Sequence, residues 1–352
     1  MMSQGNSKPR LLLMGCGSVG GVIAAGLIKA GRDLTLITHN DAISQAIQDH
    51  GLKLITPGGP LTVPATAHTD IASVAGPFDI VLLAMKATDV EQAVRDVKAL
   101  ISSTGYVVTL QNGVVEDRVG EILGRERVIG ALVGWGATMH SPGVCEMTSR
   151  GELMIGELDG TLTPRVRQLK SLLDTATPTN ISDNIYGALW SKLAINCVVT
   201  TLGVVTGQTL GTMLKRHRVR RLALAITSEV VDVAKAHHLQ LEPVGGTLDI
   251  HRLYVPSEDR FGGFRLGAVL QHAIILAVGI KFRRLRSSML QSIERGRRPE
   301  IDFMNGYVGA SGREVGVETP VNAALTTMVR EIEAGVRTPS PQNLDAIVRQ
   351  VR

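Results

Sequence analysis

Short apolar runs, separated by turn residues and by stretches of helical spacing, make up the first half of the chain. Residues 10–14 and 34–37 are two such runs, and residues 22–30 between them carry apolar side chains at helical spacing. Residues 79–85 and 106–110 are further runs that are apolar almost throughout. Strands that are apolar on both faces are typical of a parallel sheet covered by helices. The pattern therefore predicts an α/β domain with a parallel sheet.

The second half of the chain contains longer helical stretches. Residues 128–132 and 153–155 are the last strand candidates before the pattern changes near residue 183. Helices are predicted at residues 185–200, 219–237, 265–280, 287–294, 300–315 and 320–334. We therefore expect a domain boundary near Ile181, with an α/β domain at residues 1–181 and an all-α domain at residues 182–352.

A glycine-rich turn follows the first predicted strand and leads directly into a helix. It reads Gly15-Cys16-Gly17-Ser18-Val19-Gly20. In a G-x-G-x-x-G turn the first glycine permits the tight turn, the second lets the backbone approach a pyrophosphate, and the third lets helix and strand pack closely. The helix N-terminus adds N–H groups and a positive dipole. The turn therefore predicts a bound dinucleotide, and a turn without a ligand is the alternative.

The end of the second predicted strand indicates which dinucleotide is bound. An Asp or Glu at this place would bind the ribose hydroxyls and repel a 2′-phosphate. The chain has Thr38-His39-Asn40 instead, with Asp41 one residue later. Neutral donors at Thr38 and His39 suit a phosphate better than a carboxylate would. NADPH is therefore favoured over NADH, although the arginine that usually accompanies NADP binding is missing.

Polar residues also follow the next two predicted strands. Lys86 comes after one of them, and Gln111-Asn112-Gly113 comes after the other. Ligands of doubly wound sheets bind at the carboxyl ends of the strands. We therefore expect Lys86 and Asn112 to lie at the ligand site. The alternatives are that Lys86 is a solvated loop cation and that Asn112-Gly113 is simply a turn.

The all-α half has its own candidate site. Lys192 and Asn196 are four residues apart in an otherwise apolar helix, so they share one face of it. A lysine among apolar residues is costly to desolvate unless a partner or a ligand receives it, although it could also extend to the surface. Ser287, Ser288 and Glu300 lie near predicted helix starts, where helix capping is the alternative role.

Taken together, these segments resemble the ketopantoate reductase (2-dehydropantoate 2-reductase) family. The matching segments occur in the family's order and are the glycine turn, the strand ending in Lys86, Gln111-Asn112-Gly113, the helix with Lys192 and Asn196, Ser287-Ser288-Met289-Leu290-Gln291, and Glu300 to Gly306. The resemblance implies an NADPH-binding Rossmann domain followed by an all-α domain like the C-terminal domain of 6-phosphogluconate dehydrogenase. It also implies that the chain reduces a 2-oxo acid to the 2-hydroxy acid by hydride transfer.

The resemblance also implies roles for individual residues. Lys192 would be the general acid, and Glu300 would orient the substrate or that lysine. Ser288 and Asn196 would bind the substrate, and Thr200 would contact it from the position of a further substrate-binding residue. Of the residues in the first domain, the glycine turn, Lys86 and Asn112 would bind the cofactor.

The chain departs from the family pattern in two places. Thr200 stands where the family has a second asparagine that holds the substrate, so a different carbonyl or imine substrate is an alternative to ketopantoate. A non-catalytic NADPH-binding sensor is an alternative to an enzyme. In addition, residues 243–284 are longer than the family pattern and include Phe261-Gly262-Gly263-Phe264. Within them, residues 266–280 form an apolar run too short to span a bilayer, which predicts a core or subunit-interface helix and a homodimer.

Composition and charge narrow the class of protein. The chain has 352 residues, of which 44% are hydrophobic and 20% charged, as in a globular protein of about two domains. Its three cysteines suit neither a disulfide framework nor a zinc site, and residues 1–10 lack the apolar run of a secretory signal, so a cytoplasmic protein is expected. No run reaches the roughly 18 apolar residues of a membrane span.

The net charge of +5 is mild, and the basic residues gather at positions 281–298. These residues could form a solvated face or attract a small anionic carbonyl substrate. Nucleic acid is not expected as a partner, because aromatic residues for base stacking make up only 3% of the chain.

Overall fold

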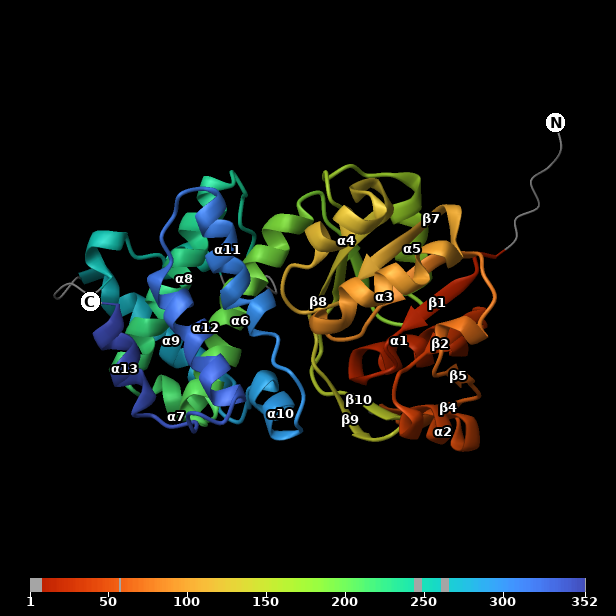
Figure 1. The fold of residues 1–352 in the computed structure, drawn as a ribbon, viewed down its shortest axis with the longest axis horizontal. Helices are drawn as coiled ribbons and strands as arrows, with labels where there is room; N and C mark the ends of the chain where they lie inside the picture. The colour runs from red at the N-terminus through yellow and green to blue at the C-terminus, as the bar shows by residue number, and fades with distance from the viewer. Residues whose placement is uncertain (1–7, 57, 244–248, 261–265, 352) are drawn as a thin grey trace. The chain divides into compact units, whose positions relative to one another are not determined.

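The chain forms two compact units in a computed structural model (Figure 1). The structure describes residues 8–56, 58–243, 249–260 and 266–351, so Phe261 to Phe264 of the predicted extension lie outside the described residues. Unit 1 consists of Met1–Gln111 and Val115–Ile185, and unit 2 consists of Asn112–Val114 and Tyr186–Arg352. The division between the units after Ile185 lies four residues beyond the predicted boundary at Ile181. The short segment Asn112–Val114 also belongs to unit 2, although it lies in the first half of the chain.

Unit 1 is built on an eight-stranded sheet with the order β12-β11-β8-β7-β6-β1-β2-β5. The strands are β1 (Leu11–Met14), β2 (Leu34–Ile37), β5 (Ala67–His68), β6 (Phe78–Leu83), β7 (Ile101–Thr109), β8 (Val128–Val133), β11 (Leu153–Glu157) and β12 (Thr179–Ile181). Neighbouring strands are parallel except that β11 runs antiparallel to β8. The predicted parallel sheet is therefore confirmed.

Helices cover both faces of this sheet. They are α1 (Ser18–Lys29), α2 (Asp41–His50), α3 (Val90–Val97), α4 (Glu116–Leu123) and α5 (Pro164–Leu173), with the 3-10 turns η1 (Ile71–Ser73), η2 (Ala87–Asp89), η3 (Lys98–Leu100) and η4 (Arg125–Arg127). α1 packs beside α5, whereas α3 packs beside α4. Leu11 and Leu13 of β1 share a hydrophobic core with α1 and α5, and the alternate residues Leu12 and Met14 are equally buried. Since side chains alternate across a strand, both faces of the sheet lie in the core.

A second sheet of four strands, in the order β4-β3-β10-β9, packs against α1. Its strands are β3 (Leu52–Thr56), β4 (Gly59–Val63), β9 (Ala137–Ser141) and β10 (Val144–Met147). The hydropathy pattern did not predict this sheet, because β9 lies in a glycine-rich stretch and is only partly buried. The sheet brings Cys145 of β10 to the glycine turn, where its thiol lies 3.7 Å from the carbonyl oxygen of Gly17.

Unit 2 is helical, as predicted. Its helices are α6 (Ile185–Thr206), α7 (Leu210–Leu214), α8 (His217–Ala236), α9 (Leu266–Lys281), α10 (Ser288–Glu294), α11 (Asn305–Glu314), α12 (Pro320–Glu333) and α13 (Asn343–Gln350), with η5 (Ile250–Leu253), η6 (Ser257–Asp259) and η7 (Ile301–Phe303) between them. α6 starts within one residue of the division between the units. It continues past the predicted end at residue 200, because its last turns are also buried. The short helices α7 and α13 were not predicted.

α6 is the core helix of unit 2. By length and composition it could cross a membrane, and it is the one such helix among the described residues, whereas the sequence pattern predicted no such segment. Lys192 interrupts its apolar run, which is why the run was not recognised. The most apolar 18-residue window of α6 is 78% buried inside the structure, as in the core helix of a globular protein.

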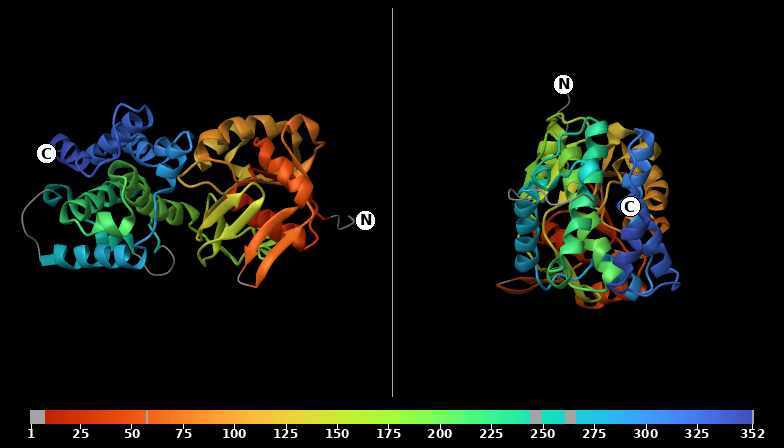
Figure 2. Two further views of the ribbon diagram at one scale, coloured as in Figure 1. Left: turned by 90° about the horizontal axis from the view of Figure 1, so that it is seen from below. Right: turned by 90° about the vertical axis from the view of Figure 1, so that its left-hand side faces the viewer.

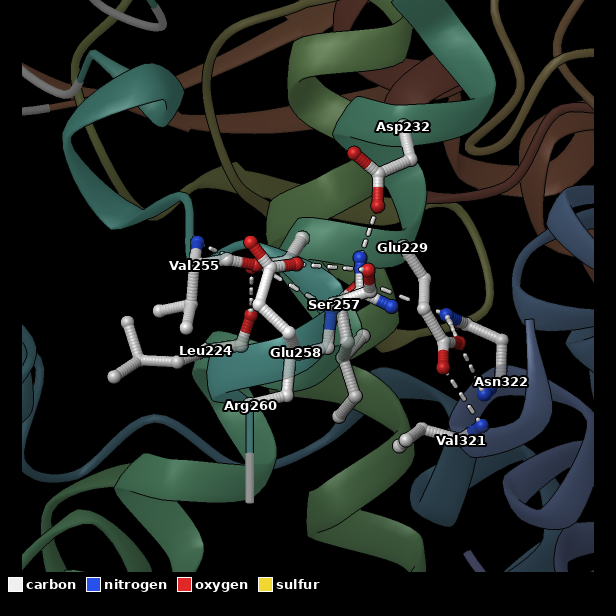
Figure 3. A network of polar contacts seen from close by, with 11 residues as sticks. Leu224, Glu229, Asp232, Val255, Ser257, Glu258, Arg260, Val321 and Asn322 are labelled. Atoms are coloured by element: carbon white, nitrogen blue, oxygen red, sulfur yellow. Dashed lines mark hydrogen bonds and ion pairs between the residues drawn. The ribbon is translucent and has the colours of Figure 1, made fainter. Parts of the chain in front are cut away.

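A network of buried polar groups ties three other helices of unit 2 to α6. Figure 3 shows Glu229 of α8 pointing toward the start of α12, where it accepts hydrogen bonds from the backbone of Val321 and Asn322 at 2.9 Å and from the Asn322 amide at 2.7 Å. The Asn322 side chain accepts a bond from Asn305 at 2.8 Å, and Asn305 accepts one from Thr201 of α6 at 2.5 Å. Burial raises the pKa of Glu229 above its ordinary value. The network therefore fixes α8, α11 and α12 relative to α6.

Candidate functional site

The glycine turn has the close approaches that its sequence predicts. Gly15 has φ +99°, and a Cβ on it would lie 2.4 Å from the backbone nitrogen of Met85. A Cβ on Gly20 would lie 2.1 Å from the carbonyl oxygen of Gly15. Gly17 differs from both, because a Cβ on it would meet no described atom within 4 Å. Two of the glycines are thus required by the fold, whereas Gly17 leaves open space beside the backbone.

The N-terminus of α1 has the properties of an anion site. Gly17 is the N-cap and has no side chain to bind the N–H groups, and the first turn contains no acidic residue. The first N–H groups of a helix have no partner within the helix itself. Ser18, Val19 and Gly20 therefore present backbone donors and the positive end of the helix dipole to the space beside Gly17. Cys16 is fully buried, and burial raises the pKa of its thiol to about 12, so it serves as a small core residue.

Thr38, His39 and Asn40 follow β2, and none of them is acidic. The first carboxylate is that of Asp41, at the start of α2. Thr38 is buried, and its hydroxyl accepts a bond from the backbone of Asn40 at 3.4 Å. The Asn40 side chain caps α2 by accepting from Ile43 at 3.1 Å. His39 is exposed. Of Thr38, His39 and Asn40, His39 is therefore the one with an exposed side chain at the end of the strand.

The carboxyl ends of β6 and β7 lie side by side and carry Lys86 and Gln111. Lys86 is half-buried and precedes η2. The Gln111 side chain is 6% exposed, and its Nε2 donates to the carbonyl oxygen of Leu83 at 3.0 Å and to the sulfur of Met85 at 3.4 Å. Its Oε1 is buried and has no hydrogen-bond partner among the described residues. The sequence pattern placed Gln111 beside Asn112 but gave it no role.

A buried carboxyl group lies just beyond this turn. Glu116 accepts hydrogen bonds from the Thr109 hydroxyl at 2.7 Å and from the backbone of Val115 at 2.9 Å. Burial raises the pKa of Glu116 to about 7. Glu116 thereby joins the end of β7 to the start of α4 across the Gln111-Asn112-Gly113 turn. A Cβ on Gly113 would lie 2.4 Å from the carbonyl oxygen of Phe303, which is within unit 2.

In unit 2, the candidate site lies on α6. Nearly every residue of this helix is buried, and the half-buried residues after its first turns are Lys192, Ile195, Asn196 and Val199. Their spacing puts them in one stripe along the helix. The Nδ2 group of Asn196 is buried and has no hydrogen-bond partner within the described part of the chain. The one accessible stripe of α6 thus carries a lysine and an unsatisfied amide donor.

Thr200 lies one turn beyond Asn196. Its hydroxyl donates to the backbone oxygen of Asn196 at 2.6 Å and approaches the sulfur of Met304 at 3.3 Å. The side chain is 7% exposed. Because a hydroxyl has a single proton, Thr200 can offer a ligand only its lone pairs.

The start of α10 is fastened to α6 at the same place. The Ser287 hydroxyl donates to the carbonyl oxygen of Thr200 at 2.7 Å and accepts from the backbone of Leu290 at 3.0 Å. Gly203 allows this contact, because a Cβ on it would lie 2.6 Å from that of Ser287. The capping role considered for Ser287 is confirmed. Ser288 follows it and is exposed.

The turn that carries Glu300 is fastened to α6 as well. Glu300 is buried and precedes η7. Asn305, five residues later, accepts from Thr201 and donates to the backbone of Cys197 at 3.4 Å. Unit 2 thus brings the predicted residues Asn196, Thr200, Ser288 and Glu300 onto three segments that meet at residues 196–201 of α6. The sequence pattern did not identify Asn305 as part of this arrangement, although it lies in the Glu300 to Gly306 segment.

Comparison with known proteins identifies the family. The model of the ketopantoate reductase PanE/ApbA family matches residues 11–160, and the model of its C-terminal domain matches residues 184–333. The chain belongs to the ketopantoate reductase family. It is therefore an NAD(P)-dependent oxidoreductase that converts a 2-oxo group to CH–OH, the reaction type of an enzyme of pantothenate biosynthesis.

Individual relatives cover nearly the whole chain. The 2-dehydropantoate 2-reductase of Mesorhizobium japonicum is 28% identical over 345 residues, covering 92% of this chain and 97% of that protein. The crystal structure of a ketopantoate reductase from Ralstonia eutropha JMP134 has a TM-score of 0.78 at 29% identity and covers 93% of this chain and 99% of its own. D-mandelate dehydrogenase with NADH and anilino(oxo)acetate also has a TM-score of 0.78 with the same coverage. Its sequence identity to this chain is 20%, and at this level the similarity shows a shared fold alone.

The residues of unit 1 fit the nicotinamide cofactor that ketopantoate reductases use. The space beside Gly17 and the donors of α1 suit a pyrophosphate, and the unsatisfied Gln111 Oε1 suits a donor from the other half of the cofactor. Among the described residues, no group of three or more His, Cys, Asp or Glu could hold a metal ion.

The basic cluster of residues 281–298 is exposed. Lys281, Arg283, Arg284, Arg286, Arg295, Arg297 and Arg298 all have exposed side chains. Arg286 pairs with Glu294 at 2.8 Å, with both side chains about half exposed. Exposed pairs of this kind contribute at most about 1 kcal/mol. This exposure agrees with the interpretation that the cluster forms a solvated face.

Proposed function

We propose that this ketopantoate reductase family member catalyses the NADPH-dependent reduction of a 2-oxo acid, ketopantoate or a close analogue, to the 2-hydroxy acid. When bound, the nicotinamide supplies a hydride to the carbonyl carbon. The chain must then supply a proton to the carbonyl oxygen and hold the substrate carboxylate. The observation that carries the proposal is the accessible stripe of α6, with Lys192 and Asn196 one turn apart.

Lys192 is the general acid in this proposal. An ammonium group stabilises the negative charge that develops on the carbonyl oxygen and donates its proton to that oxygen. The neutral amine then recovers a proton from solvent, so the balance is one hydride and one proton for each carbonyl. Support comes from the position of Lys192, because it is the one basic residue of α6.

Three other residues bind the substrate in this proposal, and a fourth orients the substrate or Lys192. Asn196 offers its unsatisfied Nδ2 to a substrate oxygen, which would remove the cost of a buried unpaired donor. Ser288, exposed at the start of α10, binds the carboxylate. Thr200 accepts a hydrogen bond from a substrate hydroxyl, since its own proton is used within α6. Glu300 orients the substrate or Lys192.

NADPH is the proposed cofactor. The support is the absence of a carboxylate from Thr38, His39 and Asn40, and the exposure of His39. A neutral or protonated imidazole can donate to a 2′-phosphate, whereas an acidic side chain would repel it. The glycine turn and the first turn of α1 bind the pyrophosphate, and Lys86 and Asn112 line the nicotinamide site.

Replacing Lys192 with methionine tests the general acid. We expect kcat to fall by at least about 100-fold, because general acid catalysis contributes factors of this size. The Kd of NADPH, measured by fluorescence titration, should stay within about twofold of wild type. Lys215→Met is the matched control, since Lys215 is an exposed lysine of the same unit. Equal turnover in the Lys192 variant would overturn the assignment.

A panel of 2-oxo acids tests the substrate. Ketopantoate, pyruvate, 2-oxoisovalerate and benzoylformate would be compared by kcat/KM with NADPH oxidation as the readout. We expect turnover of at least one branched 2-oxo acid. Tight NADPH binding without turnover of any 2-oxo acid would instead favour a non-catalytic sensor.

Exposed apolar residues of α9 in unit 2 also support a homodimer. α9 is uncharged from Gly267 to Ile280, yet Val269, Leu270 and Ile280 are 58%, 65% and 65% exposed. In Figure 2 (left) α9, in cyan, lies along one edge of this unit. A second copy of α9 in antiparallel orientation would cover these residues and keep the two basic segments after Lys281 apart. Size-exclusion chromatography with light scattering should give a dimer for wild type and a monomer for Leu270→Asp.

A reducing compartment suits the three cysteines. Cys16, Cys145 and Cys197 are free and buried. Disulfides form in oxidising compartments, so the cytoplasm is the proposed location.

A further inference from the structure

The buried amide of Gln111 is oriented by its surroundings. Its Nε2 group donates to the carbonyl oxygen of Leu83 at 3.0 Å and to the sulfur of Met85 at 3.4 Å. Both of these atoms are acceptors. Turning the amide over would put Oε1 against the Leu83 oxygen, so the orientation shown is the only one that forms these bonds. Oε1 must therefore face away from Leu83 and Met85.

That oxygen needs a donor that the described chain does not provide. Oε1 is buried and has no hydrogen-bond partner among the described residues. Buried acceptors without a partner are uncommon in folded proteins, because leaving one unpaired is costly. An unpaired acceptor of this kind is satisfied when a bound ligand brings the donor. The ligand must therefore carry an N–H or O–H group.

The position of Gln111 narrows the choice of ligand. Gln111 lies two residues beyond the end of β7, and its amide reaches the end of β6. β6 neighbours β1, which leads into the glycine turn, whereas β2 and β5 lie on the other side of β1. In doubly wound sheets a dinucleotide spans this switch in strand order, with one half over each side. The half over β6 and β7 is the nicotinamide half if the adenosine half lies at the end of β2.

The nicotinamide half offers two kinds of donor, whereas the phosphates offer none at neutral pH. Its carboxamide has N–H groups, and its ribose has O–H groups. We propose that Gln111 Oε1 accepts a hydrogen bond from the nicotinamide half of the bound cofactor and thereby positions it. This inference rests on the proposed function, since it requires a nicotinamide cofactor.

Binding of whole and half cofactors by Gln111→Leu tests the inference. We expect the Kd of NADPH, measured by fluorescence titration, to rise about tenfold, as for loss of one hydrogen bond. The Kd of 2′,5′-ADP, which lacks the nicotinamide half, should stay within about twofold of wild type by calorimetry. Gln92→Leu is the control, because Gln92 is an exposed glutamine of the same unit that pairs with Asp96.

A cofactor analogue distinguishes the two donors. 3-Acetylpyridine adenine dinucleotide phosphate lacks the carboxamide N–H groups. If the carboxamide is the donor, this analogue should bind wild type and Gln111→Leu about equally. If a ribose hydroxyl is the donor, the variant should lose affinity for the analogue as it does for NADPH. Either result supports the inference.

Two results would overturn the inference. An unchanged Kd of NADPH would mean that Oε1 is satisfied by water alone. Equal weakening of NADPH and 2′,5′-ADP would mean that Gln111 only supports the ends of β6 and β7. Failure of the proposed function is a separate result, because it is seen in wild type itself, which would then bind neither NADPH nor NADH or would bind NADPH without turning over any 2-oxo acid.

Discussion

A methyl group at Gly17 should separate cofactor binding from folding. Gly17 has φ −83° and ψ −157°, a conformation open to alanine, and a Cβ there would meet no described atom within 4 Å. The unliganded Gly17→Ala protein should therefore be as stable as wild type or up to about 1 kcal/mol more stable, because the unfolded chain loses conformational freedom. The added methyl occupies the space beside the first N–H groups of α1.

The cost appears when a pyrophosphate must approach those groups. Losing one hydrogen bond to a charged oxygen costs about 1.5–3 kcal/mol, so the Kd of NADPH should rise about 10- to 150-fold. The assay is fluorescence titration with NADPH, together with denaturant unfolding of the protein without cofactor.

Gly20→Ala is the contrasting variant. Its Cβ would lie 2.1 Å from the carbonyl oxygen of Gly15, so the turn must move. We expect this variant to lose about 1–3 kcal/mol of stability, as for an overpacked core, and to bind NADPH poorly. The reasoning would be refuted if Gly17→Ala bound NADPH as tightly as wild type, or if it destabilised the unliganded protein as much as Gly20→Ala does.

Three further predictions concern pH, buried polar groups and cofactor choice. The pKa of Glu116 is raised from 4.5 to about 7, so the folded protein binds more protons than the unfolded chain between these values and its stability falls as pH rises through them. Wild type should lose about 3 kcal/mol more than Glu116→Gln between pH 4.5 and 8 in urea unfolding, and parallel pH curves would contradict this. Glu229→Ala removes the acceptor of three N–H groups and should cost about 4 kcal/mol in the same assay, whereas a loss below about 1 kcal/mol would show that the network contributes little. His39→Asp puts a carboxylate at the exposed end of β2 and should shift the ratio of kcat/KM for NADPH and NADH at least about tenfold toward NADH; an unchanged ratio would mean that the 2′-phosphate is bound elsewhere.

Local patterns in the sequence predicted most of the secondary structure. β2 occupies the predicted residues 34–37, and α10 and α12 begin within one residue of their predicted starts. These elements are encoded by neighbouring residues: turn glycines, an N-cap serine, and a proline at the first position of a helix. The second sheet was missed because β10 pairs with β3, which is far away in sequence, and β9 joins the sheet only through β10.

The sequence by itself determined the Rossmann domain, the helical domain and the family, because each depends on motifs made of contiguous residues. It also indicated that Lys192 and Asn196 share a face of one helix. Only the tertiary structure decided which polar atoms already have partners. Ser287 proved to be a cap that holds α10 to α6, the Thr200 hydroxyl donates within its own helix, and Gln111 and Asn196 keep a buried atom unpaired. Hydrogen-bond partners depend on residues brought together from distant parts of the chain, and no local pattern records them.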